Sequence, residues 1–198
     1  MQNGCNTSVK PTDREYMKRC LDLAKLGQQS VGINPMVGAV IVKNGEILGE
    51  GFHWTPGEAH AEVQAWVQAG KPESLKGCTV YVSLEPCPHQ GRTPSCALLL
   101  AELNPDRVVV AQTDPDRRVS GKGIAILQSA GIQVEHGLCR ENAQYLNRHF
   151  IVQRIFGRPF ITLKWAQSLD RFLGFKEKSR GSMAISGPEA KQWVHRLR

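Results

Sequence analysis

An Asn44-Gly45 dipeptide between two β-prone runs narrows the choice of fold more than any other part of the sequence. Residues 37–42 and 47–52, which flank it, are rich in valine, isoleucine and glycine. Asn-Gly suits the two positive φ angles of a type I′ turn, so the runs are expected to pair as an antiparallel hairpin. Helical and strand patterns alternate after this hairpin, which indicates an α/β fold with a mixed sheet.

Local signals predict the other elements. Thr12 and Glu15 form a capping box that starts a helix, and Gly27 ends it. Apolar patterns predict further helices over residues 59–69, 97–103, 124–130 and 140–150, and strands over residues 79–84, 107–111 and 132–135.

The chain has 198 residues, enough for one core of ordinary size and a short remainder. We place the main domain at residues 1–150 and the remainder at residues 151–198, with Gly157-Arg158-Pro159 as the connection. Residues 160–165 resemble the first strand of another domain. The residues that follow are too few to close a second core, so we expect a short C-terminal remnant.

The net charge of +7 comes from the C-terminal part. Residues 1–150 hold 15 basic and 15 acidic side chains, whereas residues 151–198 hold 10 and 3. A nucleic-acid surface needs its positive charge beside the chemistry, which lies in the neutral part, so we do not expect a nucleic-acid partner. The sequence shows neither an apolar run of membrane-spanning length nor a signal segment. We therefore expect a cytoplasmic protein without membrane contact.

Three side chains of metal-binding type lie near expected helix starts. They are His60, Cys87 and Cys96, and the two cysteines flank a loop rich in proline and glycine. Imidazole nitrogen and thiolate sulfur are preferred zinc ligands, and three protein ligands leave the fourth position open for water. Helix N-termini also stabilise thiolates. The pattern therefore predicts one catalytic Zn²⁺ per chain, whereas a zinc staple or buried thiols are the structural alternatives.

Glu62 follows His60 by two residues, so the two side chains do not share one helix face. We expect its carboxyl group to flank the metal and to act as the general acid and base. His-x-Glu with Pro-Cys-x-x-Cys is the signature of zinc-dependent base deaminases. Here the first half matches, but eight residues separate the cysteines. The pattern favours a zinc-dependent hydrolase that removes an exocyclic amino group from a pyrimidine-type ring.

The sequence resembles the riboflavin-biosynthesis bifunctional deaminase–reductase family. The resemblance rests on Asn34-Pro35-Met36-Val37-Gly38, Gly51-Phe52-His53, the His60-Ala61-Glu62 motif and the segment from Leu84 to Cys96, and it continues through Asp114-Pro115 and Gly121-Lys122-Gly123. It implies a cytidine-deaminase-like three-layer α/β/α sandwich. It also implies hydrolytic deamination of a diaminopyrimidinone ribosylamino 5-phosphate in riboflavin biosynthesis.

The resemblance further implies that five residues line the pocket for this small phosphorylated pyrimidine. They are Asn34, His53, His89, Arg92 and Asp114. Residue 116 departs from the family pattern, because an aspartate stands there near the expected phosphate.

Residues 151–198 resemble the start of the reductase domain, around Leu163-Lys164, Ser168-Leu169-Asp170 and Gly187-Pro188-Glu189-Ala190. Arg171 replaces the glycine of the family pattern, and most of that domain lies outside this sequence. We therefore expect no reductase activity and no use of NADPH.

Two other functions stay open. The chain could deaminate another base, a nucleotide or a nucleic acid, with the basic tail as the recruiting segment. It could also be a non-catalytic zinc-binding scaffold that contacts a partner through tail aromatics such as Trp165 and Trp193. Exposure of this apolar tail is also a reason to expect a homo-oligomer.

Overall fold

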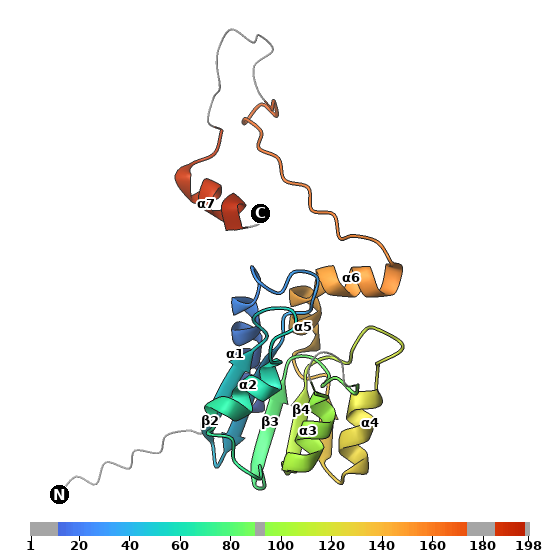
Figure 1. The fold of residues 1–198 in the computed structure, drawn as a ribbon. Coiled ribbons are helices and arrows are strands. Elements are labelled where there is room, and N and C mark those ends of the chain that lie inside the picture. Colours follow the sequence, from blue (N-terminus) through green and yellow to red (C-terminus); the bar gives the residue numbers. More distant parts are fainter. Residues whose placement is uncertain (1–11, 90–93, 174–184, 197–198) are drawn as a thin grey trace, which may run out of the picture. The chain divides into compact units, whose positions relative to one another are not determined.

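The computed structural model describes residues 12–89, 94–173 and 185–196. The chain divides into two compact units between Phe160 and Ile161. The first unit contains a five-stranded sheet in the order β2-β1-β3-β4-β5 among its described residues (Figure 1). Its elements are α1 (Asp13–Leu26), β1 (Gly38–Lys43), β2 (Glu46–Phe52), α2 (Ala61–Gln68), β3 (Cys78–Val82), α3 (Cys96–Leu103), β4 (Arg107–Val110), α4 (Lys122–Ser129), β5 (Gln133–His136), α5 (Arg140–Leu146) and α6 (Arg148–Phe156).

One strand of the sheet, β1, runs antiparallel to the other four. It pairs antiparallel with both β2 and β3, whereas β3, β4 and β5 are parallel to one another. The carboxyl ends of β2, β3 and β4 and the start of β1 therefore lie at one edge of the sheet. Segments that leave the sheet at this edge can meet although they are far apart in sequence, which is the usual place for a site in such folds.

The local signals form as expected. Asn44 and Gly45 have φ angles of 54° and 89°, and they join β1 to β2. Thr12 caps α1 in a capping box with Glu15, and Gly27 is the C-cap residue. The predicted hairpin and first helix are therefore confirmed.

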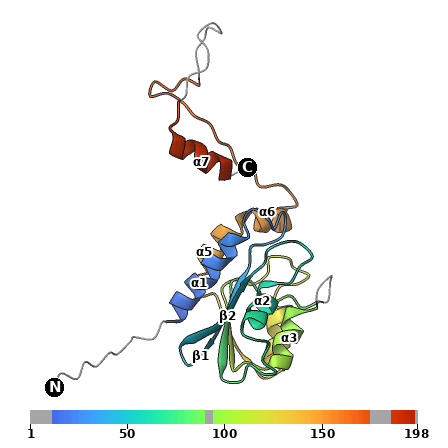
Figure 2. The ribbon, with the colours of Figure 1, turned by 60° about the vertical axis from the view of Figure 1, so that its left-hand side comes forward.

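Helices cover both faces of the sheet (Figure 2). Alternate residues of the strands point to opposite sides. On one side Val40, Val42 and Tyr81 pack with α1 and α5, while on the other Ile41 and Val80 pack with α2, α3 and α4. This arrangement confirms the predicted three-layer sandwich with a mixed sheet.

Glycines bring two helices close to the sheet. A Cβ atom at Gly51 would lie 2.4 Å from the carbonyl oxygen of Ala61, and one at Gly38 would lie 2.0 Å from that of Cys20. Both distances are far below van der Waals contact, so β2 must carry glycine where it faces the start of α2. This close packing fixes the position of the residue that precedes Ala61.

The prediction of a single helix over residues 140–150 is wrong, because the helix is divided at Asn147 into α5 and α6. The buried Asn147 amide accepts a hydrogen bond from the N–H of Met36 and donates one to its carbonyl oxygen. These bonds anchor the junction to the chain just before β1. Helix α6 then continues to Phe156, so the first unit extends past residue 150 to Phe160.

The second unit contains α7 (Pro188–Arg196). Residues 160–165, expected to form a strand, carry no strand in the structure. Their alternating apolar side chains Ile161, Leu163 and Trp165 are exposed, so no neighbouring strand among the described residues covers them. Within the described part of the chain, every helix is too short or too polar to cross a membrane.

Candidate zinc and substrate site

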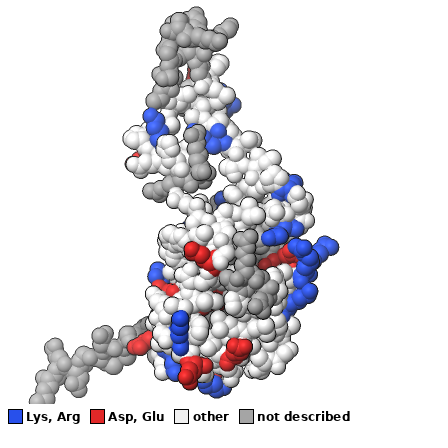
Figure 3. All heavy atoms as spheres, viewed as in Figure 1, with Lys and Arg blue, Asp and Glu red and all other residues white. Residues whose placement is uncertain are grey.

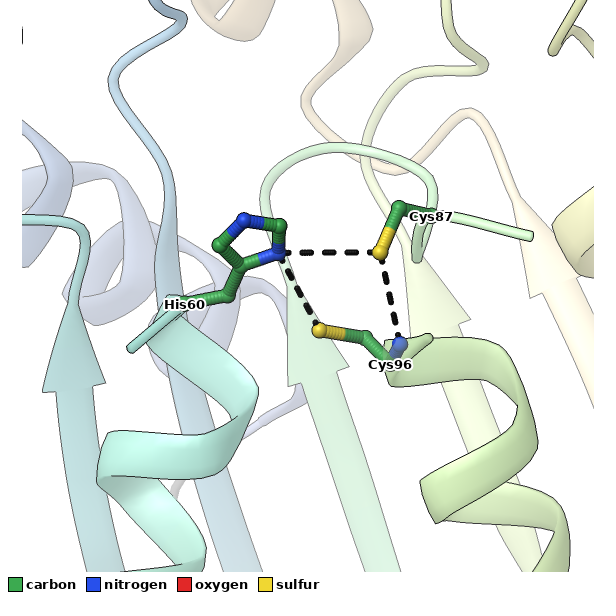
Figure 4. Close-up of side chains that lie close together, drawn as sticks. All are labelled: His60, Cys87 and Cys96. Atoms are coloured by element: carbon green, nitrogen blue, oxygen red, sulfur yellow. Dashed lines mark hydrogen bonds between the residues drawn. The ribbon is translucent and has the colours of Figure 1, made fainter. Parts of the chain in front are cut away.

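The three predicted zinc ligands meet at the edge of the sheet where β2, β3 and β4 end. His60 is the N-cap residue of α2, Cys87 lies after β3, and Cys96 is the first residue of α3. The Nδ1 atom of His60 lies 3.6 Å from the Sγ of Cys87 and 3.3 Å from that of Cys96 (Figure 4). Nitrogen and sulfur ligands on one tetrahedral zinc lie ~3.5 Å apart, so the three atoms fit a single ion.

The loop between the cysteines is held at its ends by backbone and hydroxyl groups. The N–H of Cys96 donates to the Sγ of Cys87 at 3.3 Å, and the hydroxyl of Ser95 donates to the Cys87 carbonyl oxygen at 2.8 Å. The same hydroxyl accepts a bond from the N–H of Leu98, which caps α3. The start of the helix thus aims its positive end at the sulfur atom of Cys87.

These contacts favour the thiolate form of Cys87. The hydrogen bond with Cys96 lowers the pKa of the Cys87 thiol, and His60 lowers it further. The hydrogen bond to Cys87 in turn raises the pKa of His60. A metal cation displaces the protons that remain on such ligands, so this set of donors matches the chemistry of a zinc site.

Glu62 lies in the first turn of α2, buried beside the three ligand side chains. Burial raises the pKa of its carboxyl group to about 7, and the Cys87 sulfur adds to this shift. A carboxyl group with a pKa near neutrality both accepts and donates protons readily at physiological pH.

The site opens into a cavity of about 490 Å³. Four of the five predicted substrate residues line it together with His60, Glu62 and Cys87, namely Asn34, His53, His89 and Asp114. The fifth, Arg92, lies outside the described residues. The volume suits a small molecule rather than a polymer.

Asn34 and His53 form one wall of the cavity. The amide Nδ2 of Asn34 lies 3.2 Å from the Nε2 of His53, whose ring stands edge-on to that of His60 with the centroids 5.4 Å apart. Burial lowers the pKa of His53, so its ring is neutral at neutral pH. A neutral imidazole next to an amide is suited to hydrogen bonding with a polar ring.

Four further polar side chains line the cavity. One is Asp116, which the sequence already indicated near the expected phosphate, and the others, Glu85, Arg118 and Arg154, were missed by the site prediction. Asp116 pairs with Arg118 at 2.7 Å and with Arg154 at 3.9 Å. An acidic residue directly after the buried strand was a usable signal for Glu85, whereas no local pattern indicates that Arg154 on α6 reaches the cavity.

A family model for the cytidine and deoxycytidylate deaminase zinc-binding region matches residues 10–112, which include all three ligand candidates and Glu62. The chain belongs to this deaminase family. Membership confirms the predicted class, a zinc-dependent deaminase, and its zinc cofactor, while the role of each site residue remains a prediction.

Relatives of this deaminase are riboflavin biosynthesis proteins. RibD of Haemophilus influenzae is 46% identical over 94% of this chain, and the match covers 49% of RibD. The structure of Acinetobacter baumannii RibD matches 94% of this chain and 51% of its own at 45% identity and a TM-score of 0.87.

A Thermotoga maritima structure described as a diaminohydroxyphosphoribosylaminopyrimidine deaminase/5-amino-6-(5-phosphoribosylamino)uracil reductase is 40% identical. It matches 93% of this chain and 52% of its own, with a TM-score of 0.86. The chain spans about half the length of the curated relatives it matches. These similarities confirm the resemblance stated from the sequence.

Proposed function

We propose that the chain deaminates a diaminopyrimidinone ribosylamino 5-phosphate hydrolytically, as a step in riboflavin biosynthesis. The observation that carries this proposal is the meeting of His60, Cys87 and Cys96 around one point in a cavity that also holds Glu62. The similarity to the Thermotoga maritima deaminase/reductase supports this substrate.

The ligand atoms His60 Nδ1, Cys87 Sγ and Cys96 Sγ would hold the zinc ion. Bound zinc supplies Lewis acidity that makes a water molecule a stronger nucleophile at neutral pH. Asn34 and His53 hold the pyrimidine ring in the cavity through hydrogen bonds.

Glu62 moves the protons. Its carboxylate accepts one proton from the attacking water and delivers it to a ring nitrogen, then accepts the second proton from the new hydroxyl on the ring carbon and delivers it to the leaving amino group. A C–O bond forms, the exocyclic C–N bond breaks, and ammonia leaves. Water is the only co-reactant, so the reaction needs no electron carrier.

The substrate phosphate binds at the side of the cavity lined by Arg118 and Arg154. The two guanidinium groups share the single carboxylate of Asp116, whose pKa Arg118 lowers, so Asp116 is ionised and the cluster keeps one excess positive charge. Planar guanidinium groups suit phosphate oxygens. On the visible face of the first unit, basic and acidic side chains occur together (Figure 3). Asp116, which departs from the family pattern, thus has two cationic partners.

The test is ammonia release by the purified, zinc-loaded chain from three compounds. They are the diaminopyrimidinone ribosylamino 5-phosphate, the same compound without its phosphate, and deoxycytidine monophosphate. The proposal expects the highest kcat/KM with the first compound. Preference for deoxycytidine monophosphate, or no ammonia from any compound while one zinc is bound, would contradict it.

A further inference from the structure

Glu85 is a buried carboxylate that accepts hydrogen bonds from four backbone N–H groups. In the sequence it lies between the end of β3 and the Pro86-Cys87 pair, and the residue is only 4% exposed. Its Oε2 accepts bonds from the N–H groups of Asp114 at 3.0 Å and Gly121 at 2.9 Å. Its Oε1 accepts from Gly123 at 2.9 Å and Ile124 at 3.3 Å.

One oxygen atom of Glu85 therefore holds both ends of the segment 114–121. This segment leaves the sheet after β4 and supplies Asp114, Asp116 and Arg118 to the cavity wall. Within it, the N–H of Asp116 donates to the carboxylate of Asp114 at 2.8 Å. The wall is thus a closed loop whose two ends meet at a single acceptor.

The other oxygen atom holds the start of α4. Gly123 and Ile124 lie in the first turn of this helix, whose N-cap residue is Gly121 and brings no side chain to cap it. A carboxylate at this position satisfies free N–H groups and interacts favourably with the helix dipole. A Cβ atom at Gly123 would lie 2.0 Å from the Pro86 carbonyl oxygen, so the helix start rests directly on the segment that leads to Cys87.

The four bonds leave Glu85 with no capacity for a ligand. An ionised carboxylate offers about four lone-pair sites, and backbone N–H groups occupy that number here. Although Glu85 borders the cavity, its oxygen atoms face protein donors. Its effect on a bound molecule must therefore pass through the 114–121 wall.

We propose that Glu85 is a positioning residue that fixes the substrate-binding wall at residues 114–121 relative to the zinc-ligand loop. This inference rests on the proposed function for its kinetic part only. Glu85 acts on Asp114, Asp116 and Arg118 through their backbone and leaves the contacts among His60, Cys87 and Cys96 intact.

The test compares Glu85→Gln with the wild type. Glutamine keeps the shape but turns an NH2 group toward two N–H donors, so two of the four bonds are lost. We expect KM for the phosphorylated substrate to rise about 10-fold or more, with little change in kcat and with one zinc still bound. Loss of folded protein alone would lower the apparent kcat without changing KM. The matched control is Glu102→Gln, an exposed glutamate on α3, which should change neither value.

Amide hydrogen exchange provides a readout that is independent of activity. In Glu85→Gln, the amides of Asp114, Gly121, Gly123 and Ile124 should lose protection while those of β3 keep it. An unchanged KM with unchanged exchange would overturn the inference.

If Glu85→Gln does not fold, amide hydrogen exchange of the wild type tests the proposal by itself. The loop amides of Asp114 and Gly121 should then exchange as slowly as the helical amide of Ala125, which donates to the Gly121 carbonyl oxygen and not to Glu85, and fast exchange at both overturns the proposal. If the wild type releases no ammonia, the proposed function fails, whereas this exchange result still tests the role of Glu85.

Discussion

The backbone N–H of Cys96 points at the Sγ of Cys87 over 3.3 Å, so the first residue of α3 stabilises the negative charge of the other cysteine ligand. This bond joins the two ends of the eight-residue spacing that distinguishes the chain from the shorter Cys-x-x-Cys signature. The longer loop therefore does not displace the second cysteine from the metal position.

Replacement of Cys87 by serine should remove the metal. A hydroxyl group is a far weaker zinc ligand than a thiolate, and two remaining protein ligands hold zinc poorly. Zinc per chain, measured by atomic emission after dialysis, should fall from one to well below one half. The control is Cys139→Ser, because Cys139 caps α5 outside the cluster. Full zinc content in Cys87→Ser would show that the ligand set is wrong.

Replacement of Glu62 by glutamine should separate metal binding from catalysis. The amide keeps the shape of the buried side chain but cannot carry the proton, so kcat should fall by about 10²- to 10⁴-fold while zinc stays bound. Ammonia release and zinc content are measured on the same sample. Activity within a few-fold of the wild type would eliminate the proton-transfer role.

Arg154→Gln and Arg118→Gln should weaken binding of the phosphate group. Each removes one of the two cations that share Asp116, so the cluster of Arg118, Arg154 and Asp116 loses its excess positive charge. KM for the phosphorylated substrate should rise about 10-fold, whereas KM for the dephosphorylated compound should not change. Arg14→Gln, on α1, is the control. An equal rise for both compounds would argue for a general effect on the cavity.

Asp13→Asn should make the protein less sensitive to acid. Hydrogen bonds from Arg107 lower the pKa of Asp13 in the folded state, and the Tyr81 hydroxyl contributes as well. A lowered folded pKa adds stability above the unfolded value of about 3.9, and this stability is lost as the pH falls through the folded pKa. Asp13 is partly exposed, so the effect is about 1 kcal/mol or less.

Urea unfolding of the wild type and Asp13→Asn at pH 7 and pH 3 measures this effect. The difference between their free energies of unfolding should be present at pH 7 and shrink toward pH 3. Asp22→Asn, on the exposed side of the same helix, is the control. A difference that grows as the pH falls would show that the sign is wrong.

Signals confined to a few neighbouring residues predicted the structure well. The Asn44-Gly45 turn and the Thr12 capping box depend on their own φ angles and side chains, and they need no distant partner. The zinc ligand candidates were also recognisable, because histidine and cysteine at helix starts in a polar loop have few structural explanations.

Contacts made by backbone atoms across the fold were beyond sequence reasoning. The four donors of Glu85 lie 29 to 39 residues away and are main-chain groups, which no side-chain pattern indicates. The division at Asn147 depends likewise on the backbone of Met36, 111 residues earlier.

Several expectations await other measurements. The assignment of residues 151–198 to a reductase-like domain, the absence of NADPH use, the homo-oligomeric state and the cytoplasmic location remain predictions. Size-exclusion chromatography with light scattering would decide the oligomeric state, and the exposed Trp165 is a natural fluorescence probe for a partner.

The reversed strand β1 lies between the strands that lead to the two halves of the metal site. His60 follows β2, whereas Cys87 and Cys96 follow β3, and β1 separates these strands in the sheet. A metal ion bound by the three side chains would therefore link the end of β2 to the segment after β3, across β1. Since up to 36 residues separate these donors in the unfolded chain, removal of zinc by a chelator should lower Tm. The β1–β2 hairpin should then unfold before the parallel strands β3, β4 and β5.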